Sequence, residues 1–315
     1  MKREVYVYLF TGFMDSGKTS LIRQTLVEND FSEGGLTLLL LCEDGEEEYD
    51  QEKLAEANVK LIPMESAESF TTEHLLDLDI EYKPTQIFIE YNGTWESSLF
   101  FDLELPPNWE LVQSLATVDA ESFELYLSNM RTMMMEQFFA ADVVIFNRCD
   151  EDTPRDKFRR LIKAKNRRAQ IVYENKDGMV SADTGGELPY DLEQDVIDIT
   201  DMDYGVWYLD ALEEPKKYQG KKVRFLALVY HPKKQNKNTF IPGRFVMTCC
   251  ADDITFLGFV CKNEKAFELT HQSWIMITAE IRVEFAKAYR GKGPVLYALS
   301  VTAAEKPAED VVYFG

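Results

Sequence analysis

Short apolar runs alternate with helically spaced segments up to about residue 175. Apolar runs rich in β-branched and aromatic residues are typical of buried strands, whereas apolar positions three and four residues apart indicate amphipathic helices. The pattern predicts strands at residues 5–10, 36–41, 59–62, 86–91, 111–118, 143–147 and 169–173, and helices at about 19–27, 120–139 and 154–166. Because alternating strands and helices form βαβ units, we expect an α/β domain with a mostly parallel sheet flanked by helices.

The pattern changes in the last third of the chain. Residues 175–220 are rich in Asp, Glu and Gly, as in Thr184-Gly185-Gly186-Glu187, and their periodicity is weak. Strand-like runs follow at residues 223–229, 243–249, 255–260 and 275–283, with few helical stretches between them. We therefore predict an α/β domain over residues 1–180, an irregular acidic linker over 181–219, and a smaller β-rich C-terminal domain over 220–315, with barrel or sandwich character.

Charge is distributed unevenly. The net charge is −21, yet residues 221–315 carry 14 Lys/Arg and 9 Asp/Glu (net +5), whereas residues 1–220 carry 20 and 46 (net −26). Such asymmetry supports a domain boundary near residue 220. An acidic N-terminal part argues against nucleic acid binding, and the C-terminal part lacks clustered basic residues interleaved with aromatics. We expect no nucleic acid partner.

Apolar length and cysteine usage indicate the compartment. The longest apolar run, Leu36–Cys42, is far shorter than the ~20 residues that span a bilayer. The apolar start of the chain runs into Asp15 and Lys18, unlike a signal peptide. Five cysteines without a Cys-x-x-Cys pair, and only three histidines, indicate free thiols and make a closed zinc site hard to assemble. We predict a cytoplasmic protein that does not itself span a membrane.

The octapeptide Gly12-Phe13-Met14-Asp15-Ser16-Gly17-Lys18-Thr19 fits G-x-x-x-x-G-K-[ST], the phosphate-binding loop of P-loop NTPases. It follows a predicted strand and opens onto a predicted helix, whose orphan N–H groups favour anions. The motif predicts that Lys18 reaches the β- and γ-phosphates and that the Thr19 hydroxyl holds Mg²⁺. The residues expected to bind the nucleotide here are Gly12, Asp15, Ser16, Gly17, Lys18, Thr19 and Ser20.

Carboxylates lie at the ends of two predicted strands beside this loop. Glu90 ends the run 86–91 and precedes Gly93, so its carboxylate would lie near Mg²⁺ or its waters. The acidic segment Cys42–Asp50 (CEDGEEEYD) begins where P-loop GTPases keep a loop that orders around the γ-phosphate. Its carboxylates could bind a second divalent metal, with Cys42 as a softer ligand; a solvated charge run is the alternative. We favour a metal, because these charges would repel a triphosphate without a cation between them.

A candidate base-binding motif follows the strand 143–147. Asn147-Arg148-Cys149-Asp150 resembles the Asn-Lys-x-Asp with which GTPases read guanine, where the Asp accepts from the ring N–H and the exocyclic amine. Arg148 replaces the lysine, and its aliphatic stem could still cover the base. The motif predicts that Asn147 and Asp150 bind the base and favours GTP over ATP. It speaks against an ATP-dependent kinase.

Together these motifs resemble the CobW-type GTPases, a branch of the SIMIBI class of P-loop proteins that includes the nickel chaperones UreG and HypB. The resemblance covers roughly residues 4–175 and rests on the octapeptide, Cys42-Glu43-Asp44-Gly45-Glu46 closed by Asp50, Ile89-Glu90-Tyr91-Asn92-Gly93, Thr117-Val118-Asp119-Ala120, and Glu136-Gln137 with Ala140-Ala141-Asp142 and the guanine motif. It implies a GTPase in which Lys18 stabilises charge, Thr19 and Glu90 hold Mg²⁺ directly or through water, and Glu43 orients the water or binds metal. A homodimer is expected by analogy with the SIMIBI class.

One departure from the family pattern concerns metal binding. The family's Cys-x-Cys-Cys should fall near Leu61–Ser66, where there is no cysteine. The expected Mg²⁺ ligands are Thr19 and Glu90, and a second divalent metal would depend on Cys42 and the carboxylates, Glu43 among them, a harder and weaker ligand set.

A second resemblance covers Gly220–Val283, which is similar to the C-terminal domain of an uncharacterised bacterial family associated with membrane permeases. It rests on Gly220–Arg224, Arg244–Asp253, Gly258–Val260 and Trp274–Ile277. Cys249 and Cys250 could share a metal only at a bulge or turn; the alternative is that they are small buried apolar residues.

These observations lead to two functional hypotheses. The first is a GTPase that hydrolyses GTP to GDP and phosphate and couples its nucleotide state to metal handling or partner docking. The second is a nucleotide-regulated adaptor that docks on a membrane permease or a metalloenzyme without transferring metal. The missing Cys-x-Cys-Cys favours the second.

Overall fold

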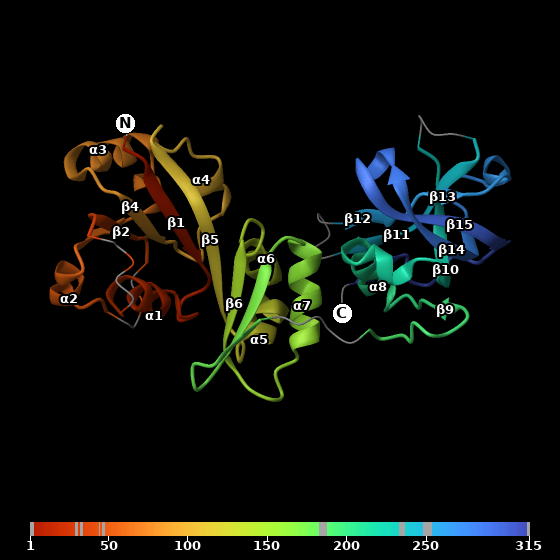
Figure 1. Cartoon of the computed structure of the whole chain (residues 1–315), viewed down its shortest axis with the longest axis horizontal. Helices are drawn as coiled ribbons and strands as arrows, with labels where there is room; N and C mark the ends of the chain where they lie inside the picture. Colours follow the sequence, from red (N-terminus) through yellow and green to blue (C-terminus); the bar gives the residue numbers. More distant parts are fainter. Residues whose placement is uncertain are drawn as a thin grey trace. The chain divides into compact units, whose positions relative to one another are not determined.

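The computed structural model describes residues 3–28, 31, 34–43, 45, 48–182, 188–232, 237–247 and 254–313. The chain divides into two compact units (Figure 1). The first unit consists of Met1–Pro154 and Lys165–Thr184, and the second consists of Arg155–Ala164 and Gly185–Gly315. Asp44 and Glu46 of the acidic motif, the Cys249–Cys250 pair and the Thr184–Glu187 stretch lie outside the described residues. None of the helices in the described ranges is long and apolar enough to cross a membrane.

Sheet A of the first unit contains eight strands in the order β3-β2-β4-β1-β5-β6-β7-β8. Their bounds are β1 (Val5–Thr11), β2 (Thr37–Leu41), β3 (Val59–Pro63), β4 (Gln86–Glu90), β5 (Trp109–Asp119), β6 (Val143–Cys149), β7 (Gln170–Asn175) and β8 (Val180–Ala182). Strands β1 to β7 pair in parallel, and β8 pairs antiparallel with β7 at one edge. These pairings confirm the predicted mostly parallel sheet. The apolar runs predicted it correctly because strands buried on both faces are typical of parallel sheets.

Helices cover both faces of this sheet. Their bounds are α1 (Lys18–Arg23, continued by a π-helical turn over Gln24–Glu28), α2 (Gln51–Glu56), α3 (Thr72–Tyr82), α4 (Ser98–Phe101), α5 (Phe123–Asn129) and α6 (Arg131–Glu136). On one face Ile22 of α1 and Leu54 of α2 share a buried cluster with Leu39. On the other face Leu75 of α3 packs in a cluster with Leu40. Successive residues of β2 thus face opposite layers, as strand geometry requires.

The predicted site residues gather at the carboxyl edge of sheet A. Parallel strands end on the same side, so β1, β2 and β4 deliver their last residues to one region. Glu90 is in register with Phe10 of β1 and with Leu41 of β2. Further along the same edge, Asn147 of β6 is in register with Asp119 of β5.

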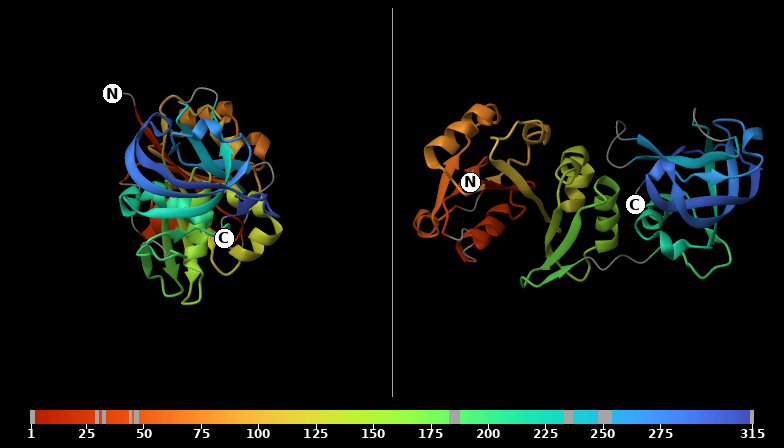
Figure 2. Two further views of the ribbon diagram at one scale, coloured as in Figure 1. Left: turned by 90° about the vertical axis from the view of Figure 1, so that its right-hand side faces the viewer. Right: turned by 45° about the horizontal axis from the view of Figure 1, so that its top comes forward.

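Sheet B of the second unit closes into a barrel, whose strands curl round one core (Figure 2). Its main strands are β10 (Lys222–Tyr230), β11 (Thr239–Met247), β12 (Ile254–Gly258), β13 (Cys261–Lys262), β14 (Trp274–Ala286) and β15 (Gly291–Ala303). The pairing runs β10-β11-β13-β15-β14 and returns to β10, with β12 and β13 successive along β11. Only the β13–β15 pair in this ring is parallel. This is the connectivity of the five-stranded Greek-key barrel known as the OB fold. The predicted β-rich domain is confirmed.

The remaining elements of the second unit are α7 (Arg155–Lys165), β9 (Ile197–Asp198), α8 (Tyr204–Glu213), β16 (Val311–Tyr313) and the short 3₁₀ turns Pro215–Tyr218, Ala266–Glu268 and Lys287–Tyr289. Residues 181–219 were predicted to form an irregular acidic linker, and this prediction is wrong for helix α8. Trp207 of this helix is fully buried, with its ring centroid 4.9 Å from that of Phe225. The sequence pattern does not indicate this helix, because acidic residues surround its apolar positions. The domain boundaries themselves stay a prediction.

Two arginines of the barrel pair with the segment that precedes α8, in opposite environments. Arg244 is fully buried, forms an ion pair with Asp201 and donates to the Glu309 carbonyl at 3.2 Å. Arg224 pairs with Asp198 while both side chains are about half exposed. Burial of one partner makes the loss of a pair costly, whereas an exposed pair contributes little.

We expect Arg244→Ala to lower the free energy of unfolding of the barrel by about 2–4 kcal/mol, since it leaves an empty buried volume and removes the charge partner of Asp201. Native-state hydrogen exchange in β10 and β11 measures this without interference from sheet A. Arg224→Ala is the matched control, and its exchange rates should stay close to those of the parent. Equal effects of the two substitutions would contradict the assignment.

Candidate functional site

The loop between β1 and α1 has a backbone that only glycine can adopt at two positions. Gly12 and Gly17 have φ of +134° and +94°, in a region that L side chains rarely enter. A Cβ at Gly12 would lie 2.4 Å from the Thr117 carbonyl oxygen, and one at Gly17 would lie 2.4 Å from Asn147 Nδ2. Helix α1 begins directly afterwards, so its first N–H groups, which have no partner within the helix, lie at the loop.

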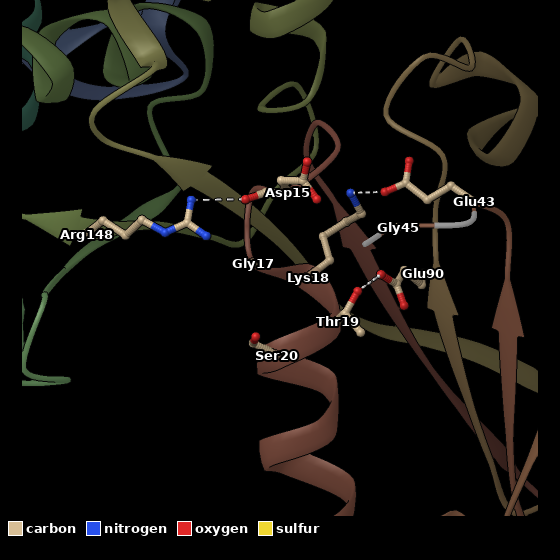
Figure 3. Close-up of a pocket in the computed structure, with 9 residues that line it drawn as sticks. All are labelled: Asp15, Gly17, Lys18, Thr19, Ser20, Glu43, Gly45, Glu90 and Arg148. Atoms are coloured by element: carbon tan, nitrogen blue, oxygen red, sulfur yellow. Dashed lines mark hydrogen bonds and ion pairs between the residues drawn. The ribbon is translucent and has the colours of Figure 1, made fainter. Parts of the chain in front are cut away.

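Lys18 folds back over this loop. Its side chain is 2% exposed, and its ammonium donates to the carbonyl oxygens of Gly12 (2.8 Å) and Phe13 (2.9 Å). It also forms an ion pair with Glu43 (Figure 3). The other carboxylate oxygen of Glu43 accepts from Gly93 N at 3.3 Å. The structure thus brings the predicted Lys18 and Glu43 into direct contact.

Glu90 is held between two hydroxyl groups at the end of β4. Thr19 donates to its Oε1 at 2.6 Å and Tyr49 donates to its Oε2 at 2.5 Å. Burial raises the pKa of Glu90 above its usual range, and the hydrogen bonds from Thr19 and Tyr49 oppose that rise. The structure thus brings together Thr19 and Glu90, both predicted to hold Mg²⁺, and adds Tyr49, a residue of the acidic segment for which no role was predicted.

Gln137 joins three segments around the loop. Gly12 N donates to its side-chain oxygen at 3.0 Å, and its side-chain nitrogen donates to the Gly93 carbonyl at 3.1 Å. Its own carbonyl accepts from the Thr11 hydroxyl at 3.2 Å. Gln137 belongs to the Glu136-Gln137 pair on which the family resemblance partly rests, but no role was predicted for its side chain; a single amide before the apolar stretch Phe138–Ala141 is a further signal.

The candidate guanine motif contacts the loop through its first two residues. Asn147 Nδ2 donates to the Ser16 carbonyl at 2.7 Å, while its buried Oδ1 has no hydrogen-bond partner among the described residues. Arg148 donates to the Asp15 carbonyl at 3.1 Å and pairs with Asp119 at 2.8 Å. The candidate guanine motif and the candidate phosphate-binding loop are therefore linked directly.

Asp150, the third predicted base contact, lies on the exposed side of this motif. Its carboxylate accepts from the Thr153 hydroxyl at 3.0 Å and from Asp152 N at 3.1 Å. The Thr153 hydrogen bond, helped by the nearby charge of Lys176, lowers the pKa of Asp150 below its usual range. The carboxylate is therefore ionised at neutral pH and can accept hydrogen bonds.

A cavity of about 120 Å³ lies at the centre of these groups (Figure 3). It is lined by Asp15, Gly17, Lys18, Thr19, Ser20, Glu43, Gly45, Glu90 and Arg148. Neither Cys42 nor Asp150 lines it. The glycine backbone, the ammonium and the helix N-terminus suit phosphate oxygens, and the hydroxyl–carboxylate pair Thr19–Glu90 is a set of hard ligands that suits Mg²⁺. The residues present fit both groups.

Cys42 lies apart from these polar groups. Its side chain packs in the apolar cluster with Leu40 and Met64 and is 4% exposed. Burial, followed by the charges of Glu43 and Glu90, raises the pKa of its thiol, which disfavours the thiolate that binds metal. In the parts of the chain that the structure describes, no group of three or more His, Cys, Asp and Glu side chains is arranged to hold a metal ion. The assignment of Cys42 as a ligand stays a prediction that these contacts do not favour.

Comparisons with known proteins find both predicted resemblances. Residues 6–173 match the sequence model of the family described as CobW/HypB/UreG, nucleotide-binding domain, and residues 178–314 match that of the DUF1980 C-terminal domain. A comparison with curated proteins gives no match.

Similar solved structures include the Zn(II)-bound YjiA GTPase from E. coli, at 17% identity over 82% of this chain and 90% of that one (TM-score 0.43). A Zn(II)-bound triple mutant of YjiA GTPase matches at 18% identity over 72% and 74% (TM-score 0.45). The hydrogenase maturation factor HypB from Archaeoglobus fulgidus matches at 19% identity over 55% and 82% (TM-score 0.39). Similarity at this level does not transfer the roles of individual residues.

Gly93→Ala should abolish tight nucleotide binding. The new Cβ would lie 2.2 Å from the Gly12 carbonyl oxygen, which accepts from Lys18, so the loop must shift. A misplacement of about 1 Å can cost on the order of 100-fold in the rate of a reaction that depends on exact geometry, and we expect a loss of similar size in nucleotide affinity. Gly291→Ala is the matched control, because it lies in β15 of the barrel and its new Cβ would be 3.8 Å from its nearest neighbour, the Tyr289 carbonyl oxygen. Calorimetric titration with nucleotide on both folded variants checks this, and parent-like binding by Gly93→Ala would refute it.

Glu90→Gln should stabilise the fold at neutral and higher pH. A raised pKa means that the folded state binds the Glu90 proton more tightly than the unfolded state, so ionisation destabilises the fold as pH rises above the usual carboxyl range. The amide keeps a hydrogen-bond acceptor and carries no charge. The thermal midpoint of the variant should exceed that of the parent at pH 8, and the gap should close as pH falls towards 5. Glu110→Gln, at an exposed position of β5, controls for the loss of one negative charge. A variant less stable than the parent throughout would contradict this account.

Proposed function

The chain belongs to the CobW/HypB/UreG family of nucleotide-binding proteins, and from this we propose that it is a GTPase that hydrolyses GTP to GDP and phosphate. The observation that carries the proposal is the cavity in which a glycine-constrained loop, Lys18 and the Thr19–Glu90 pair converge. Few other ligands need closely spaced backbone donors, a buried ammonium and hard oxygen ligands together.

In this proposal the chain contributes by positioning and electrostatics. Lys18 and the N–H groups at the start of α1 hold the phosphates and stabilise the charge that develops during transfer to water. Thr19 and Glu90 hold Mg²⁺ directly or through water; when bound, this ion neutralises phosphate charge and polarises the phosphoryl group. Glu43 orients the attacking water or binds metal once it has left Lys18.

Guanine selectivity is proposed to lie with Asn147 and Asp150. The ionised Asp150 carboxylate offers two acceptors for the ring N–H and the exocyclic amine of guanine. Arg148 donates to the Asp15 carbonyl of the loop and pairs with Asp119 at the end of β5. Through these contacts it would fix the position of the base relative to the phosphates. Its stem would cover the base in place of the lysine of other GTPases.

For the biological role, we propose that the nucleotide state governs metal handling or the docking of a partner. The alternative is a nucleotide-regulated adaptor of a membrane permease or metalloenzyme that transfers no metal. The absence of cysteine from residues 61–66 and the buried position of Cys42 support the adaptor. Titration with Zn²⁺ in the presence and absence of GTP separates the two, since only metal transfer requires tight binding that depends on nucleotide. We also propose a cytoplasmic location and, by analogy with the SIMIBI class, a homodimer.

Asp150→Asn tests both the nucleotide and its recognition. The amide replaces one acceptor by a donor, so GTP affinity should fall while affinity for xanthosine triphosphate, whose base carries the complementary carbonyl, should rise. Competition titrations with GTP, ATP and xanthosine triphosphate measure the exchange, and Asp152→Asn is the neighbouring control. Tight binding of ATP with no binding of GTP by the parent would overturn the proposed function.

A further inference from the structure

The Lys18 ammonium has no hydrogen-bond donor left for a phosphate. An ammonium carries three N–H groups, and Lys18 has three acceptors: the carbonyls of Gly12 and Phe13 and the carboxylate of Glu43. The ion pair is also removed from water, because the side chains of Lys18 and Glu43 are 2% and 6% exposed. The charge that should attract phosphate is therefore already neutralised within the chain.

Glu43 makes the contacts expected of a bound phosphate. It is an anion, it pairs with Lys18, and its second oxygen accepts from Gly93 N at 3.3 Å. A phosphate in the same place would meet the carboxylate as a like charge, and it would leave Glu43 buried without its cation. Both effects are unfavourable, so the two anions exclude each other.

The segment that carries Glu43 is fixed at both ends. Cys42 N donates to the Glu90 carbonyl at 3.0 Å, and the Cys42 carbonyl accepts from Asn92 Nδ2 at 3.2 Å. At the other end Tyr49 is buried and donates to Glu90, and Asp50 caps helix α2. None of these contacts involves the Glu43 side chain, so breaking its ion pair with Lys18 leaves them in place.

We propose that Glu43 is a built-in competitor for the phosphate site, which a bound nucleotide must displace from Lys18. The proposal rests on the proposed function and adds its regulation, because nucleotide binding frees the Glu43 carboxylate. A ligand that holds Glu43 away from Lys18 strengthens nucleotide binding, and nucleotide strengthens the binding of that ligand by the same factor. The position of the Glu43 carboxylate thereby reports occupation of the phosphate site.

The test measures binding of pyrophosphate and of GDP without divalent metal, by calorimetry in the presence of a chelator. We expect Glu43→Gln to bind both about tenfold more tightly than the parent, because the amide is isosteric with the carboxylate but does not neutralise Lys18. Glu48→Gln is the matched control: it removes the same charge from an exposed position of the same segment, and its affinities should stay within about twofold of the parent.

The outcomes separate the competitor from the function it regulates. Pyrophosphate and GDP binding by the parent with no gain in Glu43→Gln would overturn the competitor and leave the GTPase intact. Pyrophosphate binding that tightens in Glu43→Gln, with no GDP binding by any variant, would support the competitor and overturn guanine recognition.

Hydrogen exchange supplies a second readout that does not depend on a variant. On addition of GDP without metal, residues 12–19 of the parent should become more protected and the segment around Gly93, whose N–H donates to Glu43, less protected. Increased protection of both segments would contradict displacement of Glu43.

Discussion

The arrangement of the nucleotide site depends on one buried cation. Lys18 is almost fully removed from water, and a charge in that position is tolerated only with close partners. Two loop carbonyls and Glu43 provide them, and Gly93 holds Glu43 in place. The phosphate-binding loop, Glu43 and Gly93 are distant in the sequence. They meet here because the loop carbonyls and Glu43 stabilise the charge of one buried ammonium group, and Gly93 holds Glu43.

Negative charge exceeds positive charge in this site. Glu43 and Glu90 both lie near Lys18, and the raised pKa of Glu90 is the electrostatic consequence of burial with too little compensation. A proton, a magnesium ion or hydroxyl donors can each compensate part of this excess negative charge. The site is therefore suited to exchanging one set of charges for another, which is what binding of a nucleotide with its cation entails.

The two units place their polar chemistry differently. In sheet A, parallel strands bury both faces and leave only their carboxyl ends available, so the site consists of loops at one edge. In sheet B the strands close on themselves around an apolar core that includes Trp207 of α8. Arg244 is the main polar group buried in that unit, and its partners lie in the segments just before α8 and just before β16.

Much of the fold and part of the site could be predicted from sequence. The strands of sheet A followed from apolar runs, and the loop followed from its glycines and Lys18, because short-range backbone preferences and burial patterns are written locally. The sequence pattern does not predict helix α8, because the segment around it is acidic. It does not predict strand β15 either, because that strand begins with glycines and a proline, which are rare in strands. The domain boundaries and the individual site roles stay predictions.

The sequence by itself determined the phosphate loop, the parallel order of elements and the residue types available for chemistry. Only the tertiary structure decided which of them meet. Gln137 lies 125 residues from Gly12 along the chain, and Glu43 and Tyr49 reach Lys18 and Glu90 across separate strands. Strand parity also turned Cys42 into the apolar core, away from the carboxylates beside it in sequence. These outcomes depend on chain crossings and register, which no local pattern specifies.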